Sequence, residues 1–197
     1  MTHNASIARS EFILGGQRSG KSARAERLAS AWLQGEGVQG GRRAVLVATA
    51  GARDGEMRER IARHQRDRAE RVPGMETVEE PLALAQVLRQ HSDAHTLVVV
   101  DCLTLWLTNL LMPAPPVDPV NETAVLSLTA DLCTAIASAA GPVVVVGNEI
   151  GLGVIPMGRE VRDFVDALGR LNQSVAAACK RVTLMAAGLP LTLKDAA

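Results

Sequence analysis

Residues 12–22 read "FILGGQRSGKS", an apolar run followed by the pattern Gly15-x-x-x-x-Gly20-Lys21-Ser22 of a phosphate-binding loop. The glycines of such a loop let backbone N–H groups turn toward an anion, and the helix that follows points its positive end there. A Gly-rich turn can match this pattern by chance. Here a strand-like run precedes it and a helical pattern follows, which favours nucleotide binding.

Each residue of the loop is predicted to contact nucleotide. Lys21 would reach the outer phosphates as a point charge and act in catalysis, while the Ser22 hydroxyl would ligate Mg²⁺. The predicted loop residues are Gly15, Gly16, Gln17, Arg18, Ser19, Gly20, Lys21 and Ser22.

Short apolar runs recur along the chain, each bounded by polar residues or glycine, as in strands covered on both faces. They are Phe12–Leu14, Ala44–Ala48, Thr96–Val100, Val143–Val146 and Val182–Met185. Helical periodicity fills 22–34, 121–140 and 159–180, with Asn121 as an expected cap. This alternation predicts a three-layer α/β fold with a mostly parallel central sheet. The stretch "PAPPVDP" at 113–119 is expected to be a surface loop.

Asp101 follows four apolar residues in "LVVVD" and suits the acid that helps Ser22 hold the metal. An Asp at a strand end is also an ordinary turn residue, so the assignment depends on the phosphate loop. With Ser22, Asp101 completes the predicted metal site.

Length, composition and net charge limit the class of protein to which the chain can belong. A chain of 197 residues with 47% hydrophobic content suits one globular domain, with residues 1–10 expected as a flexible N-terminal extension. A net charge of zero favours neither nucleic acid nor an anionic membrane. No run is long enough to span a bilayer. Cys102, Cys133 and Cys179 form no metal pattern, so we expect buried thiols and a cytoplasmic location.

His64 lies in "MRERIARHQRDRAER", where six arginines alternate with acidic residues. From charge alone, the favoured interpretation is a solvated helix with i,i+4 ion pairs. The alternative is a histidine that attacks phosphorus, because its pKa near 6.5 leaves much free base at neutral pH. Neighbouring arginines would stabilise charge on the transferred group.

Seven stretches together resemble the bifunctional adenosylcobinamide kinase / adenosylcobinamide-phosphate guanylyltransferase family, from about residue 11 to 194. They are "LGGQRSGKS", "VATA", "ERIARH", "TVEEP", "VDCLTLWLTNLL", "GNEIGLGVIP" and "RDFVDALGRLNQSVAAA". The resemblance implies phosphorylation of the aminopropanol hydroxyl of adenosylcobinamide by ATP or GTP, with Mg²⁺. It then implies transfer of GMP from GTP through a guanylyl-histidine, giving adenosylcobinamide-GDP in adenosylcobalamin synthesis. The guanylylated histidine falls on His64.

By the same resemblance, the GTP site extends beyond the loop to Ala48, Thr49, Ala50, Gln65, Arg66, Asp67, Arg68, Glu79 and Asp101. The Thr49 hydroxyl would contact phosphate, and Glu79 a guanine or ribose edge. Glu149 and the turn Gly151–Gly153 would shape the site near the cobinamide. The family also implies a homotrimer. Where many members carry a Trp after the histidine segment, this chain has Met75.

Two other functions compete with this reading. One is a P-loop small-molecule kinase without guanylyl transfer, for which His64 would be dispensable. The other is a non-enzymatic nucleotide switch that binds without turnover.

Overall fold

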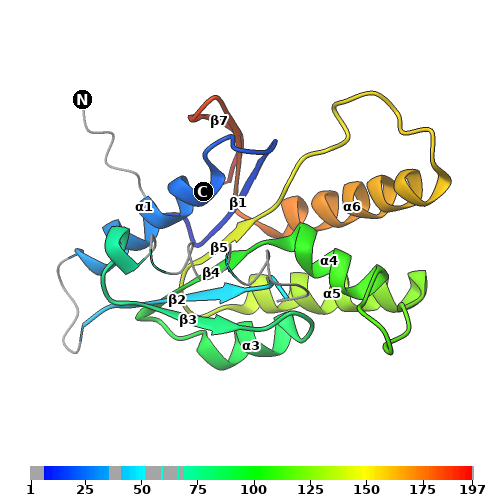
Figure 1. Cartoon of the computed structure of the whole chain (residues 1–197). Coiled ribbons are helices and arrows are strands. Elements are labelled where there is room, and N and C mark those ends of the chain that lie inside the picture. Colours follow the sequence, from blue (N-terminus) through cyan, green and yellow to red (C-terminus); the bar gives the residue numbers. More distant parts are fainter. Residues whose placement is uncertain (1–6, 36–40, 52–58, 60–65, 67–68, 197) are drawn as a thin grey trace.

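The computed structural model describes residues 7–35, 41–51, 59, 66 and 69–196. Helices and strands alternate along these residues (Figure 1). The strands are β1 Ser10–Gly15, β2 Arg43–Ala48, β3 Met75–Glu79, β4 Thr96–Asp101, β5 Val143–Val146, β6 Arg181–Ala186 and β7 Leu189–Asp195. The helices are α1 Lys21–Leu33, α3 Leu84–His91, α4 Leu103–Leu111, α5 Glu122–Ser138 and α6 Arg159–Ala178.

The strands form one sheet in the order β3-β2-β4-β5-β1-β6-β7. The pairings from β3 to β6 are parallel, and β7 alone runs antiparallel, against β6. β1 lies inside the sheet between β5 and β6, so the loop that follows it opens at the carboxyl edge, where ligands bind in such sheets.

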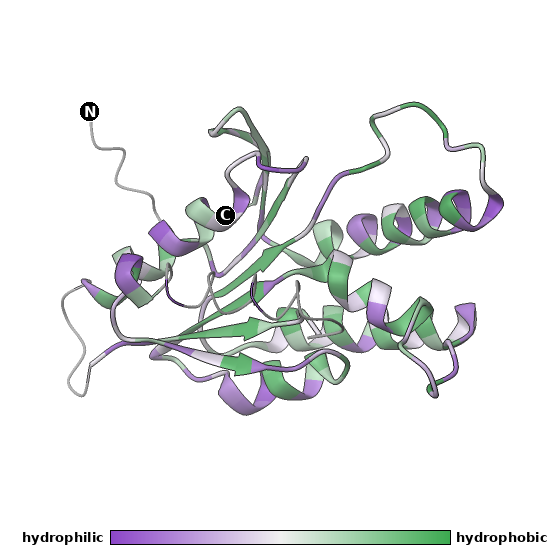
Figure 2. Ribbon diagram, viewed as in Figure 1, coloured by the Kyte–Doolittle hydropathy of each residue, from purple (hydrophilic) through white to green (hydrophobic). Residues whose placement is uncertain are grey.

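Alternate side chains of the strands enter two separate cores. Phe12 and Leu14 pack with α3, α4, α5 and α6, whereas Ile13 packs with Leu28 of α1. Figure 1 shows α1 apart from the group of α4, α5 and α6, and Figure 2 shows apolar residues along the central strands. The predicted three-layer α/β fold with a mostly parallel sheet is confirmed, because helices cover both faces of the strands.

All five predicted strands and all three predicted helices are present. Asn121 caps α5, since its side chain accepts a hydrogen bond from the Ala124 N–H. The 113–119 segment is a loop between α4 and α5. Within the part of the chain that the structure describes, four further elements, β3, β7, α3 and α4, were not predicted. Five of the nine residues of α4 are buried, including Trp106 and Leu107. Its sequence therefore lacks the polar face, repeated with the helical period, by which a surface helix is predicted.

The prediction of a flexible N-terminal extension over residues 1–10 is wrong for residues 7–10. Ser10 is buried in β1, and Arg9 donates a 2.8 Å hydrogen bond to the Ala139 carbonyl. Ile7 packs against the core that contains Ile13 and Leu28. Contacts therefore hold residues 7–10, and residues 1–6 lie outside the described part. No helix of the described residues is long and apolar enough to cross a membrane.

Candidate nucleotide site

The phosphate loop connects β1 to α1, and glycine is required at both ends of it. Gly15 has φ +152°, and a Cβ there would lie 2.5 Å from both the Met185 carbonyl oxygen and Ser19 Oγ. Gly20 caps α1 at φ +100°, in the left-handed region that side chains disfavour. These two glycines explain why this turn, with this curvature, follows β1.

The turn between β6 and β7 supports the loop from one side. The Gly188 N–H donates a 3.0 Å hydrogen bond to the Ser19 carbonyl, and a Cβ on Gly20 would lie 3.2 Å from Gly188 Cα. Ala187 and Gly188 both have positive φ, at 50° and 80°. This contact was not predicted from the sequence. The pair Ala187-Gly188 between two β-rich runs was the signal available for a tight hairpin.

Lys21 is buried, and its Nζ donates a 2.7 Å hydrogen bond to the Gly16 carbonyl across the loop. Burial lowers the pKa of Lys21 below 10.5, while Cys102 and Asp101 oppose that shift. The ammonium therefore already lies over the loop, and a bound phosphate would supply the negative charge that favours its protonated form.

Asp101 and Ser22 meet at the carboxyl edge of the sheet, where Ser22 Oγ donates a 3.2 Å hydrogen bond to Asp101 Oδ2. A hydroxyl and a carboxylate facing each other fit Mg²⁺, which prefers oxygen ligands and completes its shell with water and phosphate oxygens. No cluster of three or more His, Cys, Asp or Glu among the described residues suggests another metal site. The residues predicted to hold the metal are thus adjacent.

Three predicted site residues lie side by side at the ends of neighbouring strands. In the register of the parallel strands, Glu79 pairs with Ala48, Ala48 with Asp101, and Asp101 with Val146 beside β1. The structure therefore brings Glu79, Ala48 and Asp101 to the edge that carries the phosphate loop. Glu79 is exposed there at the end of β3.

The Thr49 side chain, directly after β2, is fully buried. Its hydroxyl donates to the Cys102 carbonyl at 2.7 Å and accepts from the Cys102 N–H at 2.8 Å. Both bonds tie the end of β2 to the residue that follows β4, and the predicted contact of the hydroxyl with phosphate stays a prediction. Asn109 of α4, a residue not predicted, donates a 2.8 Å hydrogen bond to the Thr49 carbonyl. Ala50 follows, half-buried.

The histidine segment is described in part only. Arg66 is helical and exposed. His64, Gln65, Asp67 and Arg68 lie outside the described residues, so their predicted roles remain predictions.

The start of the segment between β5 and α6 is tied to the phosphate loop. The Glu149 N–H donates a 3.1 Å hydrogen bond to the Gly15 carbonyl. Thr104 Oγ1 accepts from the Asn148 N–H at 3.0 Å, and Asn172 Nδ2 donates to the Asn148 carbonyl at 3.1 Å. Thr104 and Asn172 were not predicted as site residues. The Glu149 carboxylate accepts from the Gly151 N–H at 2.7 Å, and its predicted role near the cobinamide stays a prediction.

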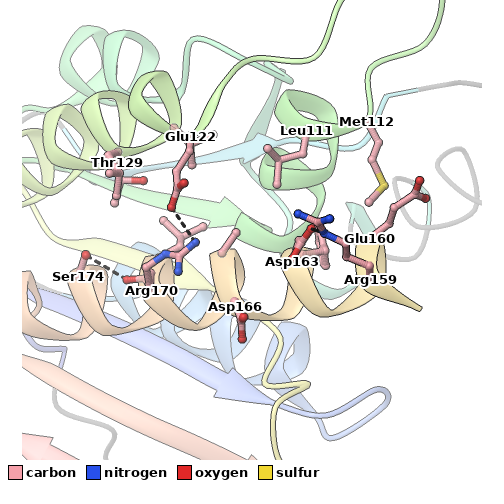
Figure 3. Close-up of a pocket in the computed structure, with 15 residues that line it drawn as sticks. Leu111, Met112, Glu122, Thr129, Arg159, Glu160, Asp163, Asp166, Arg170 and Ser174 are labelled. Carbon is pink, nitrogen blue, oxygen red and sulfur yellow. Dashed lines mark hydrogen bonds and ion pairs between the residues drawn. The ribbon is translucent and has the colours of Figure 1, made fainter. Parts of the chain in front are cut away.

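Two cavities differ in size and in chemistry. One of about 250 Å³ is lined by 18–23 of the phosphate loop and α1. A larger one of about 720 Å³ lies between α5 and α6, where Arg170 and Glu122 form a 3.0 Å ion pair (Figure 3). The larger cavity contains none of the predicted site residues. The smaller cavity is lined by predicted nucleotide-binding residues, and Ser22 in its lining donates a hydrogen bond to Asp101.

A parallel sheet that carries this loop, a buried lysine and a strand-end aspartate beside the helix serine defines a P-loop nucleotide-binding α/β protein. The sequence model of the family described as cobinamide kinase / cobinamide phosphate guanyltransferase matches residues 11–193. The chain belongs to this family.

Curated relatives agree with that membership. The chain is 46% identical to the bifunctional adenosylcobalamin biosynthesis protein CobP of Pseudomonas aeruginosa, over 93% of this chain and 96% of that protein. It is 33% identical to CobU of Escherichia coli and 32% identical to CobU of Salmonella typhimurium. Each match covers 93% of this chain and 98% of the relative.

Among solved structures, the fold is similar to flagellar accessory protein FlaH from Methanocaldococcus jannaschii. The TM-score is 0.53 at 14% identity, with 96% of this chain and 80% of that chain covered. At this identity the likeness concerns the fold alone.

Proposed function

We propose that the chain phosphorylates the aminopropanol hydroxyl of adenosylcobinamide and then guanylylates the product. The phosphoryl donor is ATP or GTP, and the final product is adenosylcobinamide-GDP, made in the cytoplasm during adenosylcobalamin synthesis. The observation that carries this proposal is the family match over 11–193 on a chain whose Lys21, Ser22 and Asp101 converge at one phosphate loop.

In the first reaction, the substrate hydroxyl oxygen forms a bond to the γ-phosphorus. The bond from that phosphorus to the β–γ bridging oxygen breaks, the nucleoside diphosphate leaves and the hydroxyl proton is released. Lys21 and the loop N–H groups hold the phosphates, and Ser22 with Asp101 would hold Mg²⁺, which when bound neutralises phosphate charge. Such transfer depends mainly on positioning and charge stabilisation.

In the second reaction, an imidazole nitrogen of His64 attacks the α-phosphorus of GTP. A P–N bond forms, the α–β bridging bond breaks and pyrophosphate leaves. A phosphate oxygen of cobinamide phosphate then attacks the same phosphorus, the P–N bond breaks and His64 is regenerated. The covalent intermediate splits one displacement into two. Glu79, at the carboxyl edge beside Ala48, supports a guanine or ribose contact on that side of the loop.

The test is covalent labelling of the full chain with Mg²⁺ and GTP that carries the label on the α-phosphate. After denaturation, we expect label that is labile in acid and stable in base, as a phosphoramidate requires. The variant His64→Asn should carry none, whereas the matched control His91→Asn, at the end of α3, should be labelled like the unchanged protein.

Two outcomes would contradict the proposal. Phosphorylation of adenosylcobinamide without any covalent label would indicate a kinase that lacks guanylyl transfer. Nucleotide binding without turnover of any corrinoid would indicate a switch.

We also propose that copies of the chain form a trimer, as the family resemblance implies. The edge strand β7 exposes Leu189, Leu191 and Leu193 at 71%, 57% and 56%, which suits a contact surface. Light scattering of the purified protein tests this, and a monomeric mass would refute it.

A further inference from the structure

The segment 149–158 connects β5 to α6, and we name it the β5–α6 arch. Figure 1 shows it extending away from the sheet before it returns to the start of α6. Its large apolar side chains are unusually exposed: Leu152 at 81%, Val154 at 97%, Ile155 at 77% and Met157 at 95%. None of them belongs to either core of the described residues. Figure 2 shows the apolar character of the arch.

Hydrogen bonds hold the arch at both of its ends. At the near end, the Glu149 N–H bonds the Gly15 carbonyl, and Asn172 of α6 holds the Asn148 carbonyl. At the far end, Arg162 donates to the carbonyls of Pro156 and Met157 at 3.0 and 2.5 Å. The exposed side chains therefore belong to a segment fixed on the body of the protein. Exposed apolar clusters of this kind mark ligand or partner surfaces.

The near end of the arch is attached to the first glycine of the phosphate loop. In phosphoryl transfer, the acceptor must lie beside the terminal phosphate, in line with the bond that breaks. A segment whose first residue, Glu149, is hydrogen-bonded to Gly15 is thus positioned to contact the acceptor. A nucleotide held by Lys21, Ser22 and backbone donors does not need four exposed aliphatic side chains.

The acceptor in the proposed function is a corrinoid, and this inference rests on that function. A corrin macrocycle presents broad faces rich in methyl groups, and its aminopropanol arm carries the reacting hydroxyl away from the ring. Apolar faces bind to aliphatic side chains by exclusion of water. The chain has two Phe, two Trp and no Tyr: Phe12 and Trp106 are buried in the core, and Trp32 and Phe164 are half-buried. None of the four lies in the arch, whose exposed apolar side chains are aliphatic.

We infer that the β5–α6 arch is the corrinoid-binding surface, with Leu152, Val154, Ile155 and Met157 in contact with the macrocycle. The ring lies against the arch, and its arm reaches back along Glu149 toward the phosphate loop. The arch then determines acceptor affinity without taking part in nucleotide binding.

The first test changes Leu152→Ser together with Val154→Ser in the full chain. The matched control is Leu126→Ser with Val117→Ser, a Leu and a Val that are 52% and 60% exposed elsewhere. For the arch variant we expect the KM for adenosylcobinamide to rise at least about tenfold, with the dissociation constant for GTP changed less than about twofold. The control variant should keep both values, and covalent labelling by GTP should be normal in each.

A second test measures binding without turnover. Val154→Cys is placed in a Cys133→Ser background, because Cys102 and Cys179 are buried, and is treated with a maleimide in the dark. We expect adenosylcobinamide to slow the modification of residue 154, and GTP to have no such effect. Since no reaction is needed, this result is independent of guanylyl transfer through His64, whose failure would appear only in the labelling test.

An unchanged KM together with no protection by adenosylcobinamide would overturn the inference. A lower oligomeric mass of the arch variant, again without protection, would also overturn it and would identify the arch as a contact between copies of the chain. Protection by the corrinoid supports the inference whatever the mass.

Discussion

Ser22 Oγ at the start of α1 donates a 3.2 Å hydrogen bond to Oδ2 of Asp101 at the end of β4, although 79 residues separate them in the sequence. The two meet because β1 and β4 both pair in parallel with β5, which brings their carboxyl ends to one edge of the sheet. The contact unites the phosphate loop with the acid of the strand end, and it is the basis of the proposed metal site.

Changing either partner of this contact should weaken metal-dependent turnover. For Asp101→Asn we expect kcat for the kinase reaction to fall by about 10- to 100-fold, as for residues that hold a metal or its ligands. The Mg²⁺ concentration for half-maximal rate should rise. Steady-state rates over a range of Mg²⁺ concentrations measure both quantities.

Two substitutions of Ser22 test the role of its hydroxyl. Ser22→Thr keeps the hydroxyl and should retain activity, whereas Ser22→Ala should behave like Asp101→Asn. Equal activity of the Thr and Ala variants would show that the hydroxyl has no role in holding the metal.

Substitutions of Thr49 distinguish a structural role of its hydroxyl from a role in binding phosphate. In Thr49→Val the Cys102 N–H and carbonyl lose their partner, so the free energy of unfolding should fall by about 1–3 kcal/mol. Thr49→Ser should restore most of it. Urea unfolding measures the stability, and titration with GTP measures affinity. A large loss of GTP affinity with unchanged stability would instead place phosphate on the Thr49 hydroxyl.

Glu11 is a buried carboxylate near the start of β1. Its Oε1 accepts hydrogen bonds from Arg24 Nε at 2.7 Å and from Thr183 Oγ1 at 2.8 Å, and only 1% of the side chain is exposed. Glu11→Gln removes the charge opposite Arg24, and loss of one partner of a buried pair costs about 3–5 kcal/mol. We expect a destabilisation of this order in urea unfolding.

The control for this change is Glu76→Gln, which removes one partner of the exposed Arg43–Glu76 pair on β2 and β3. Its urea midpoint should be unchanged, because exposed pairs contribute little. Similar effects of the two substitutions would refute the importance of burial at Glu11.

The buried thiols predict a loss of stability in alkali. Burial raises the pKa of Cys102 to about 11 and that of Cys179 to about 12, whereas an exposed thiol titrates near 9.0. Above that pH the unfolded chain releases protons that the native chain still holds, so the free energy of unfolding falls. The slope is at most about 1.4 kcal/mol per pH unit for each thiol.

Urea unfolding in reducing buffer between about pH 8 and pH 10.5 measures this slope. Replacing Cys102 and Cys179 by Ala should flatten it, even if the variant is less stable at every pH. A slope unaffected by the substitutions would assign the alkaline loss to other groups.

Burial explains which strands could be predicted from the sequence and which could not. Val143–Val146 is fully buried between helices, so four valines in a row are read as a strand. By contrast, β7 exposes most of its residues, and its existence depends on pairing with β6 across the turn at Ala187-Gly188. β3 likewise has exposed Glu76 and Thr77 and is held by pairing with β2. Edge strands of this kind lack a local signal.

The sequence by itself determined the phosphate loop, the alternation of strands and helices, and the family, because glycine positions and apolar periods act over a few neighbouring residues. The tertiary structure decided which side chains meet. Thr49 bonds Cys102 from 53 residues away, Ser22 meets Asp101, and Glu149 reaches the Gly15 carbonyl. These contacts depend on strand order and register, which arise when the whole sheet assembles and which no local period encodes.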